Sequence, residues 1–78
     1  MTTAYRTNSI AKGRAIRPFA ELAVVRATRD LCENEVRVPK GARGAIVLAY
    51  DGVDAYEVEF TEPVHAVIGV RGGDIELA

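Results

Sequence analysis

Residues Val36 to Phe60 read V-R-V-P-K-G-A-R-G-A-I-V-L-A-Y-D-G-V-D-A-Y-E-V-E-F. A Pro39-Lys40-Gly41 turn precedes one apolar run, and Asp51-Gly52 separates that run from a second. Proline presets φ and glycine accepts positive φ, so this punctuation marks tight turns, and we expect positive φ at Gly41 or Gly44. Short strands with dense turns are typical of a very small β-barrel. The sequence therefore predicts an all-β fold, a small five-stranded barrel.

The same spacing of apolar runs and turns extends to both sides of this stretch. The polar and acidic residues from Thr28 to Arg37 predict a long loop in which Leu31 is tucked under the chain. Arg71 to Asp74 predicts a tight turn or a single turn of 3₁₀ helix. Five strands are expected: Glu21–Thr28, Ala45–Tyr50, Ala55–Glu62, Val64–Val70 and Ile75–Leu77.

The clearest alternation lies between Ala55 and Glu62. Side chains on successive residues of a strand point to opposite faces. We therefore expect Tyr56, Val58 and Phe60 in the core, joined by Phe19, with Glu57 and Glu59 facing water.

The body of the chain, residues 19 to 77, carries four short motifs. They are L-A-V-V at 22–25, P-x-G-x-x-G-x-I at 39–46, Y-E-V-E-F at 56–60 and D-I at 74–75. In these motifs the chain resembles an uncharacterised bacterial family of small SH3-like barrels, a domain of unknown function. The resemblance implies the SH3-like fold, and it implies no established activity.

Charge divides the chain into two parts. Residues 1–17 hold four basic residues and no acid, whereas residues 18–78 hold six basic and eleven acidic residues, giving +4 and −5 within a net charge of −1. We interpret 1–17 as a flexible basic arm and 18–78 as the barrel. The arm is expected to lie on an acidic surface near Glu57 and Glu59, or to contact nucleic acid.

The sequence carries no pattern for catalysis, metal binding or cofactor binding. The single cysteine, Cys32, excludes an internal disulfide, and its acidic neighbours predict a small semi-buried residue and a poor nucleophile. His65, the only histidine, has no second ligand nearby. A lone thiol, no export signal and no apolar run long enough to span a bilayer favour a cytoplasmic protein.

Two strands are apolar on both faces. In Ala45–Tyr50 we expect Ile46, Leu48 and Tyr50 to point one way and Val47 and Ala49 the other, and Val67 should oppose Ile68. A barrel this small has room inside for one face, so the other should pack against something. The chain is therefore predicted to be a non-catalytic interaction module, a homo-oligomer and most simply a dimer, that binds or regulates another protein. The candidate interface residues are Leu48, Tyr50, His65 and Val67.

Three other functions stay open. Nucleic-acid binding would use the basic residues of the arm and the glycine turn, although few aromatic side chains are left for base stacking. A pore enzyme resembling type II dihydrofolate reductase would need a Gln-Ile-Tyr triplet where this chain has Val67-Ile68-Gly69. An antitoxin-like or immunity-like regulator would suit the acidic body. The candidate polyanion contacts are Arg6, Lys12, Arg14, Arg17, Lys40 and Arg43.

Overall fold

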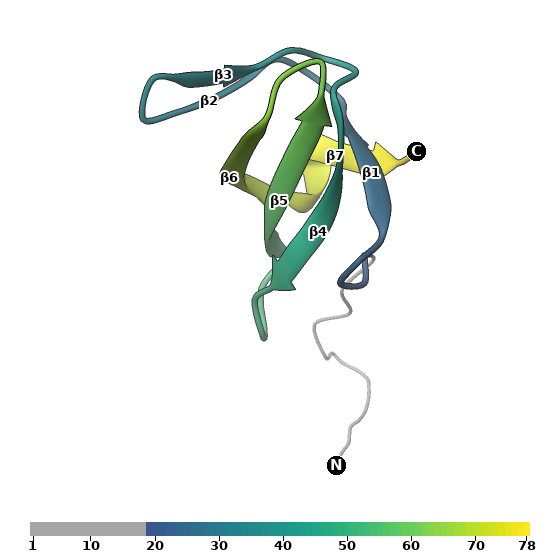
Figure 1. Ribbon diagram of the computed structural model, residues 1–78. Helices are drawn as coiled ribbons and strands as arrows, with labels where there is room; N and C mark the ends of the chain where they lie inside the picture. The colour runs from purple at the N-terminus through teal and green to yellow at the C-terminus, as the bar shows by residue number, and fades with distance from the viewer. Residues whose placement is uncertain (1–18) are drawn as a thin grey trace.

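The computed structural model describes residues 19–78, and the basic arm expected at residues 1–17 lies outside them (Figure 1). The described part is all-β, as predicted, with one turn of 3₁₀ helix. Its elements are β1 (Val24–Ala27), β2 (Leu31–Glu33), β3 (Val36–Val38), β4 (Arg43–Ala49), β5 (Ala55–Glu62), β6 (Ala66–Arg71), η1 (Gly72–Asp74) and β7 (Ile75–Leu77).

Five strands form one antiparallel sheet in the order β6-β5-β4-β1-β7, and β2 pairs only with β3. Figure 1 shows this sheet curving from β6 through β5 and β4 to β1, with the β2–β3 hairpin projecting beyond it. The end strands β6 and β7 do not pair with each other. The five predicted strands therefore form one sheet, with two further strands in a separate hairpin, and the sheet does not close into a barrel.

The two additional strands come from the segment that we expected to be a loop. Residues 31–33 pair with residues 36–38, and the two residues between them, Asn34 and Glu35, have φ of 51° and 69°. Positive φ at both central residues defines the tight turn that matches the twist of a hairpin. Such turns usually contain glycine, so Asn-Glu gave no hairpin signal in the sequence. The predicted burial of Leu31 is confirmed.

The core lies on the concave side of the sheet, and β5 supplies its largest side chains. Tyr56, Val58 and Phe60 are fully buried, as the alternation predicted, and the bounds of β5 are those expected. Phe19 packs edge-on against Tyr56 with ring centroids 5.6 Å apart. The Tyr56 hydroxyl donates a 2.8 Å hydrogen bond to Asp54, so the buried phenol keeps a polar partner.

The first strand is shorter than predicted. The chain turns between Ala20 and Ala23, whose backbone groups form a 3.1 Å hydrogen bond, and β1 begins only at Val24. Leu22 lies in this turn with φ of 73° and is 80% exposed. Of the apolar residues expected to build this strand, Val25 enters the core and Leu22 and Val24 do not.

A bulge in β4 changes which of its side chains face the core. The pairing with β5 shifts between Ile46 and Leu48, so Val47 is an additional residue. Ile46 is buried, whereas Val47 and Leu48 are both exposed and Ala49 packs against the core. The predicted grouping of Ile46 with Leu48 and Tyr50 on one face is therefore wrong.

The turns and the end of the chain agree with the sequence. Gly41 has φ of 88°, which confirms positive φ in the turn that leads into β4. Residues 72–74 form the predicted 3₁₀ turn, and the last strand covers Ile75–Leu77 as expected. The strand expected to begin at Val64 begins at Ala66.

Candidate interaction face

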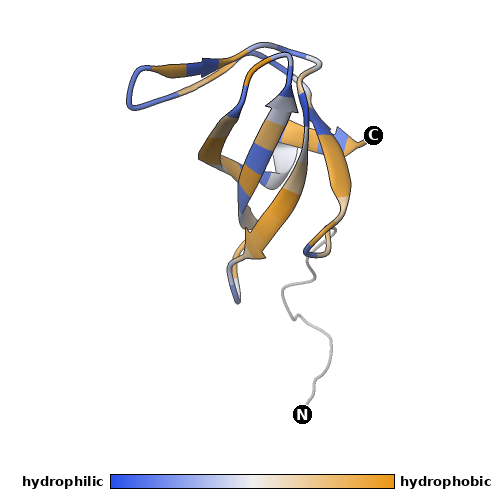
Figure 2. Cartoon of the chain, in the orientation of Figure 1, coloured by the Kyte–Doolittle hydropathy of each residue, from blue (hydrophilic) through white to orange (hydrophobic). Residues whose placement is uncertain are grey.

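The convex side of the five-stranded sheet carries a set of exposed apolar side chains that we call the outer face. Cross-strand pairing places Val24 opposite Ala45, Ala45 opposite Glu59 and Glu59 opposite Val67, which makes one row across four strands. The apolar members that are most exposed are Val24 (51%), Val47 (45%), Leu48 (41%) and Val67 (56%). Figure 2 shows hydrophobic stretches on β1 and β4 beside alternating polar positions on β5.

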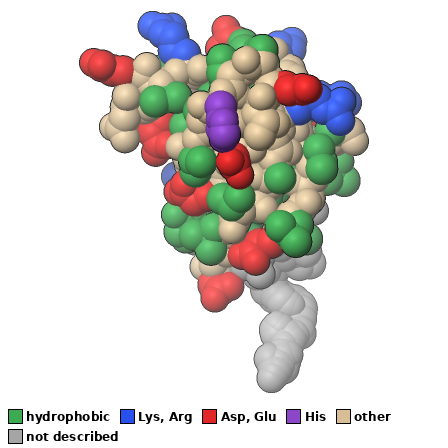
Figure 3. All heavy atoms as spheres, viewed as in Figure 1, with side chains coloured by type: hydrophobic (Ala, Val, Ile, Leu, Met, Phe, Trp, Pro, Cys, Tyr) green, Lys and Arg blue, Asp and Glu red, His purple; other side chains and the backbone are tan. Residues whose placement is uncertain are grey.

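Two glutamates of β5 occupy the middle of the outer face, and each has a hydrogen-bond partner. The Tyr50 hydroxyl donates to Glu57 over 2.9 Å, and His65 Nε2 lies 3.0 Å from Glu59 Oε2. Both carboxyl groups point away from the core, as the alternation of β5 predicted, although each residue is only partly exposed. Figure 3 shows hydrophobic, acidic and histidine side chains side by side on this face.

The four residues predicted as an interface come together around these glutamates. Leu48 is opposite Glu57, and Val67 is opposite Glu59. Tyr50 is hydrogen-bonded to Glu57, and His65 is hydrogen-bonded to Glu59. The outer face therefore unites apolar contact area with a polar centre whose groups are already paired within one chain, which lowers the free-energy cost of excluding water from it.

Sequence reasoning missed two members of this face, Val24 and Val47. Val24 was assigned to a strand that was expected to start three residues earlier, and Val47 was expected opposite Ile46 but was not named as an interface residue. Alternation alone could not show that Val47 and Leu48 share this face, because the bulge exposes Leu48 although Ile46 is buried. The bulge is a property of the β4–β5 register, which no residue of the apolar run Ala45–Ala49 marks.

The hydrogen bond to Glu57 raises the pKa of Tyr50 above its ordinary value of 10.0, and the negative charges of Glu57 and Glu33 act in the same direction. The folded state therefore favours the neutral phenol. This contribution to stability is complete below pH 10 and is lost as the pH rises through the higher pKa of the folded state.

We expect the parent protein to lose more stability than a Tyr50→Phe variant as the pH is raised above 10. Chemical unfolding of both proteins at a series of pH values measures the difference. Absorbance of the phenolate, compared between the two proteins, gives the titration of Tyr50 itself. A Tyr50 midpoint at or below 10.0 would show that the bond to Glu57 is not formed in solution.

The candidate polyanion contacts are not gathered by the described structure. Arg6, Lys12, Arg14 and Arg17 lie outside the described residues. Arg43, at the start of β4, is opposite both Arg26 and Glu62, and the backbone N–H of Lys40 donates to Asp30 over 2.8 Å. Lys40 and Arg43 thus each lie beside an acidic residue in the fold.

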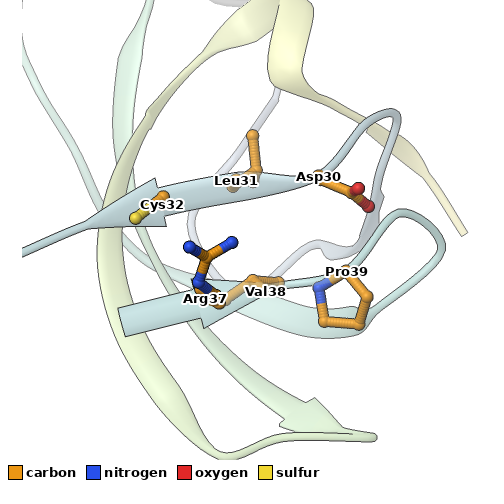
Figure 4. A pocket seen from close by; sticks show the side chains of 6 residues that line it. All are labelled: Asp30, Leu31, Cys32, Arg37, Val38 and Pro39. Carbon is orange, nitrogen blue, oxygen red and sulfur yellow. The ribbon is translucent and has the colours of Figure 1, made fainter. Parts of the chain in front are cut away.

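Cys32 lies in a shallow cavity of about 240 Å³ on the β2–β3 hairpin. It is exposed, so the prediction that it is semi-buried is wrong, because the segment forms a projecting hairpin and no loop folds over it. Figure 4 shows the Arg37 guanidinium reaching from β3 towards β2. Arg37 and Cys32 are direct cross-strand partners. The cavity is smaller than the usual range for small-molecule sites.

Within residues 19–78, no group of three metal-ligating side chains is found. Asp74 forms a 2.6 Å ion pair with Arg29 and accepts a hydrogen bond from the backbone N–H of Arg71. The same residues contain no helix that is long and apolar enough to cross a membrane.

Fold and surface together define a small all-β domain with an apolar, acid-centred sheet face. A family model described as Domain of unknown function (DUF4926) matches residues 21–68, which is more than half of the chain. The chain therefore belongs to this family, and the predicted membership of a family of unknown function is confirmed. Comparisons with curated proteins and with solved structures gave no match.

Proposed function

We propose that this protein is a non-catalytic interaction module that self-associates, as a dimer, through the outer face of its sheet. The observation that carries the proposal is that Val24, Val47, Leu48 and Val67 are all exposed on one side of four paired strands. Exposed apolar side chains gathered on one face are typical of interaction sites, and here they surround two hydrogen-bonded glutamates. The resemblance to SH3-like barrels remains a prediction from the sequence.

A second copy of the chain is the simplest occupant of this face. Closed two-fold pairing is the commonest assembly of soluble proteins, and it uses the same surface on both subunits. The glutamates at its centre are bonded to Tyr50 and His65, so each carboxylate enters the interface with a hydrogen-bond partner. The acidic body of the chain would suit a basic partner, so we extend the proposal to regulation of another protein by the dimer.

We expect Leu48→Lys and Val67→Lys to weaken self-association at least about tenfold, equivalent to about 1.4 kcal/mol. Each new lysine would be opposite Glu57 or Glu59, so the folded monomer should tolerate it. Val53→Lys is the matched control, because Val53 is similarly exposed (51%) but lies in the β4–β5 turn. Size-exclusion chromatography with light scattering over a dilution series measures the effect.

Deleting residues 1–17 should leave most of the association intact. Exposed ion pairs contribute about 0–1 kcal/mol each, so a basic arm adjusts an assembly that the apolar face determines. If the truncated protein is a monomer while Leu48→Lys still associates, the arm is the main interface element. A parent protein that stays monomeric at millimolar concentration would exclude the proposed dimer.

A further inference from the structure

At the free edge of β6, acidic side chains accept hydrogen bonds from two backbone N–H groups. The Gly69 N–H donates to Glu33 Oε1 over 2.9 Å, and the Arg71 N–H donates to Asp74 Oδ2 over 2.9 Å. Neither acceptor belongs to β5, so both N–H groups point to the edge that no strand of residues 19–78 covers. Because this direction alternates along an antiparallel strand, the N–H of Val67 points to the same edge.

Glu33 reaches this edge from a separate sheet. It is the last residue of β2, which among the described strands pairs with β3 alone, and it is 36 residues away from Gly69 in the chain. Its carboxylate occupies the place that a carbonyl of an added strand would take. Uncovered strand edges are templates for pairing with another chain, and charged side chains are a common way to block them.

We propose that the edge of β6 is a second association surface, that its occupant is β6 of another copy, and that Glu33 blocks it. The hairpin thus acts as a strap across the position where the added strand would begin to pair. This surface is distinct from the outer face, and the inference does not rest on the proposed function.

The sequence of β6 fits antiparallel pairing with itself. A two-fold axis at Gly69 places the two glycines opposite each other and Val67 opposite Arg71 of the second copy. No like charges meet in this register, and the glycines leave the two backbones free to approach. Asp74 still covers Arg71, which limits the new ladder to its centre.

The test uses the full chain carrying Leu48→Lys, which removes the outer face from the comparison. Glu33→Ala deletes the blocking carboxylate, whereas Glu33→Gln keeps a side-chain acceptor for the Gly69 N–H. We expect Glu33→Ala to dimerise with an apparent Kd at least about tenfold lower than that of Glu33→Gln, measured by light scattering over a dilution series. Equal masses for the two variants at every concentration would overturn the proposal.

A second substitution locates the association. Gly69→Pro removes the outward N–H without touching a bond to β5, a position where an edge strand accepts proline. Added to Glu33→Ala, it should restore the monomer. In Glu33→Ala alone, hydrogen exchange at the Gly69 amide should slow as the protein concentration rises. Association that survives Gly69→Pro, or exchange that does not depend on concentration, would place the contact elsewhere and contradict the inference.

A monomeric parent protein would remove the proposed outer-face dimer without affecting this comparison. Conversely, a parent dimer that Leu48→Lys dissociates, with no gain from Glu33→Ala, would leave the outer face and reject the edge. The two proposals therefore fail separately.

Discussion

Replacing Phe60 with alanine should lower the free energy of unfolding by about 3–5 kcal/mol, the range for truncating a buried phenylalanine. Phe60 is fully buried at the centre of the core, opposite Gly44 of β4 and Ala66 of β6. Small domains are stable by only about 5–15 kcal/mol, so the loss is comparable with the whole stability. Urea unfolding at a fixed protein concentration measures it.

Thr61→Ala, at the exposed next position of β5, is the control for Phe60→Ala. Surface substitutions usually change stability by no more than about 0.5 kcal/mol. A Phe60→Ala protein that unfolds cooperatively at the same denaturant concentration as Thr61→Ala would mean that Phe60 is not part of the core.

Gly44→Ala should be as disruptive as the loss of Phe60, although it adds only a methyl group. A Cβ on Gly44 would overlap the carbonyl oxygen of Glu59 and lie 2.7 Å from the Cα of Phe60. Both are backbone atoms of β5, so no side-chain rotation relieves the contact and the two strands must separate. Ordinary overpacking costs about 1–3 kcal/mol, and we expect the loss to reach the upper end of this range or exceed it.

Gly73→Ala is the matched control, since no atom lies within 4 Å of a Cβ built on Gly73. Thermal melts of the two alanine variants, with circular dichroism in the far ultraviolet, compare them directly. Equal melting temperatures would show that β4 and β5 are not in close contact at Gly44.

The parts of the fold that could be predicted are those with local signals. The alternation of Ala55–Glu62 set the bounds of β5 and its core face, and the Pro39-Lys40-Gly41 turn set the entry to β4. The glycines of residues 72–74 marked the 3₁₀ turn before β7. In each case neighbouring residues determine the backbone conformation. The sequence pattern therefore predicts the element without information from the rest of the chain.

The missed features depend on contacts between distant residues. The Val47 bulge exists only in the register of β4 against β5, and the contact between Glu33 and Gly69 joins two separate sheets. The predicted interface residues Leu48, Tyr50, His65 and Val67 do meet on one face. Glu57 and Glu59, which connect them, were expected to face water and the basic arm, and their bonds to Tyr50 and His65 were not predicted. The register between paired strands brings these residues together, and no local sequence pattern predicts that register.

In the proposed dimer, the outer faces of two copies are in contact. An isotope-filtered nuclear Overhauser experiment on an equal mixture of labelled and unlabelled chains detects this contact. We expect intermolecular cross-peaks from the methyl groups of Val24, Val47, Leu48 and Val67, with none from Val53. Intermolecular cross-peaks confined to the β2–β3 hairpin, or a complete lack of them at concentrations where light scattering shows a dimer, would contradict it.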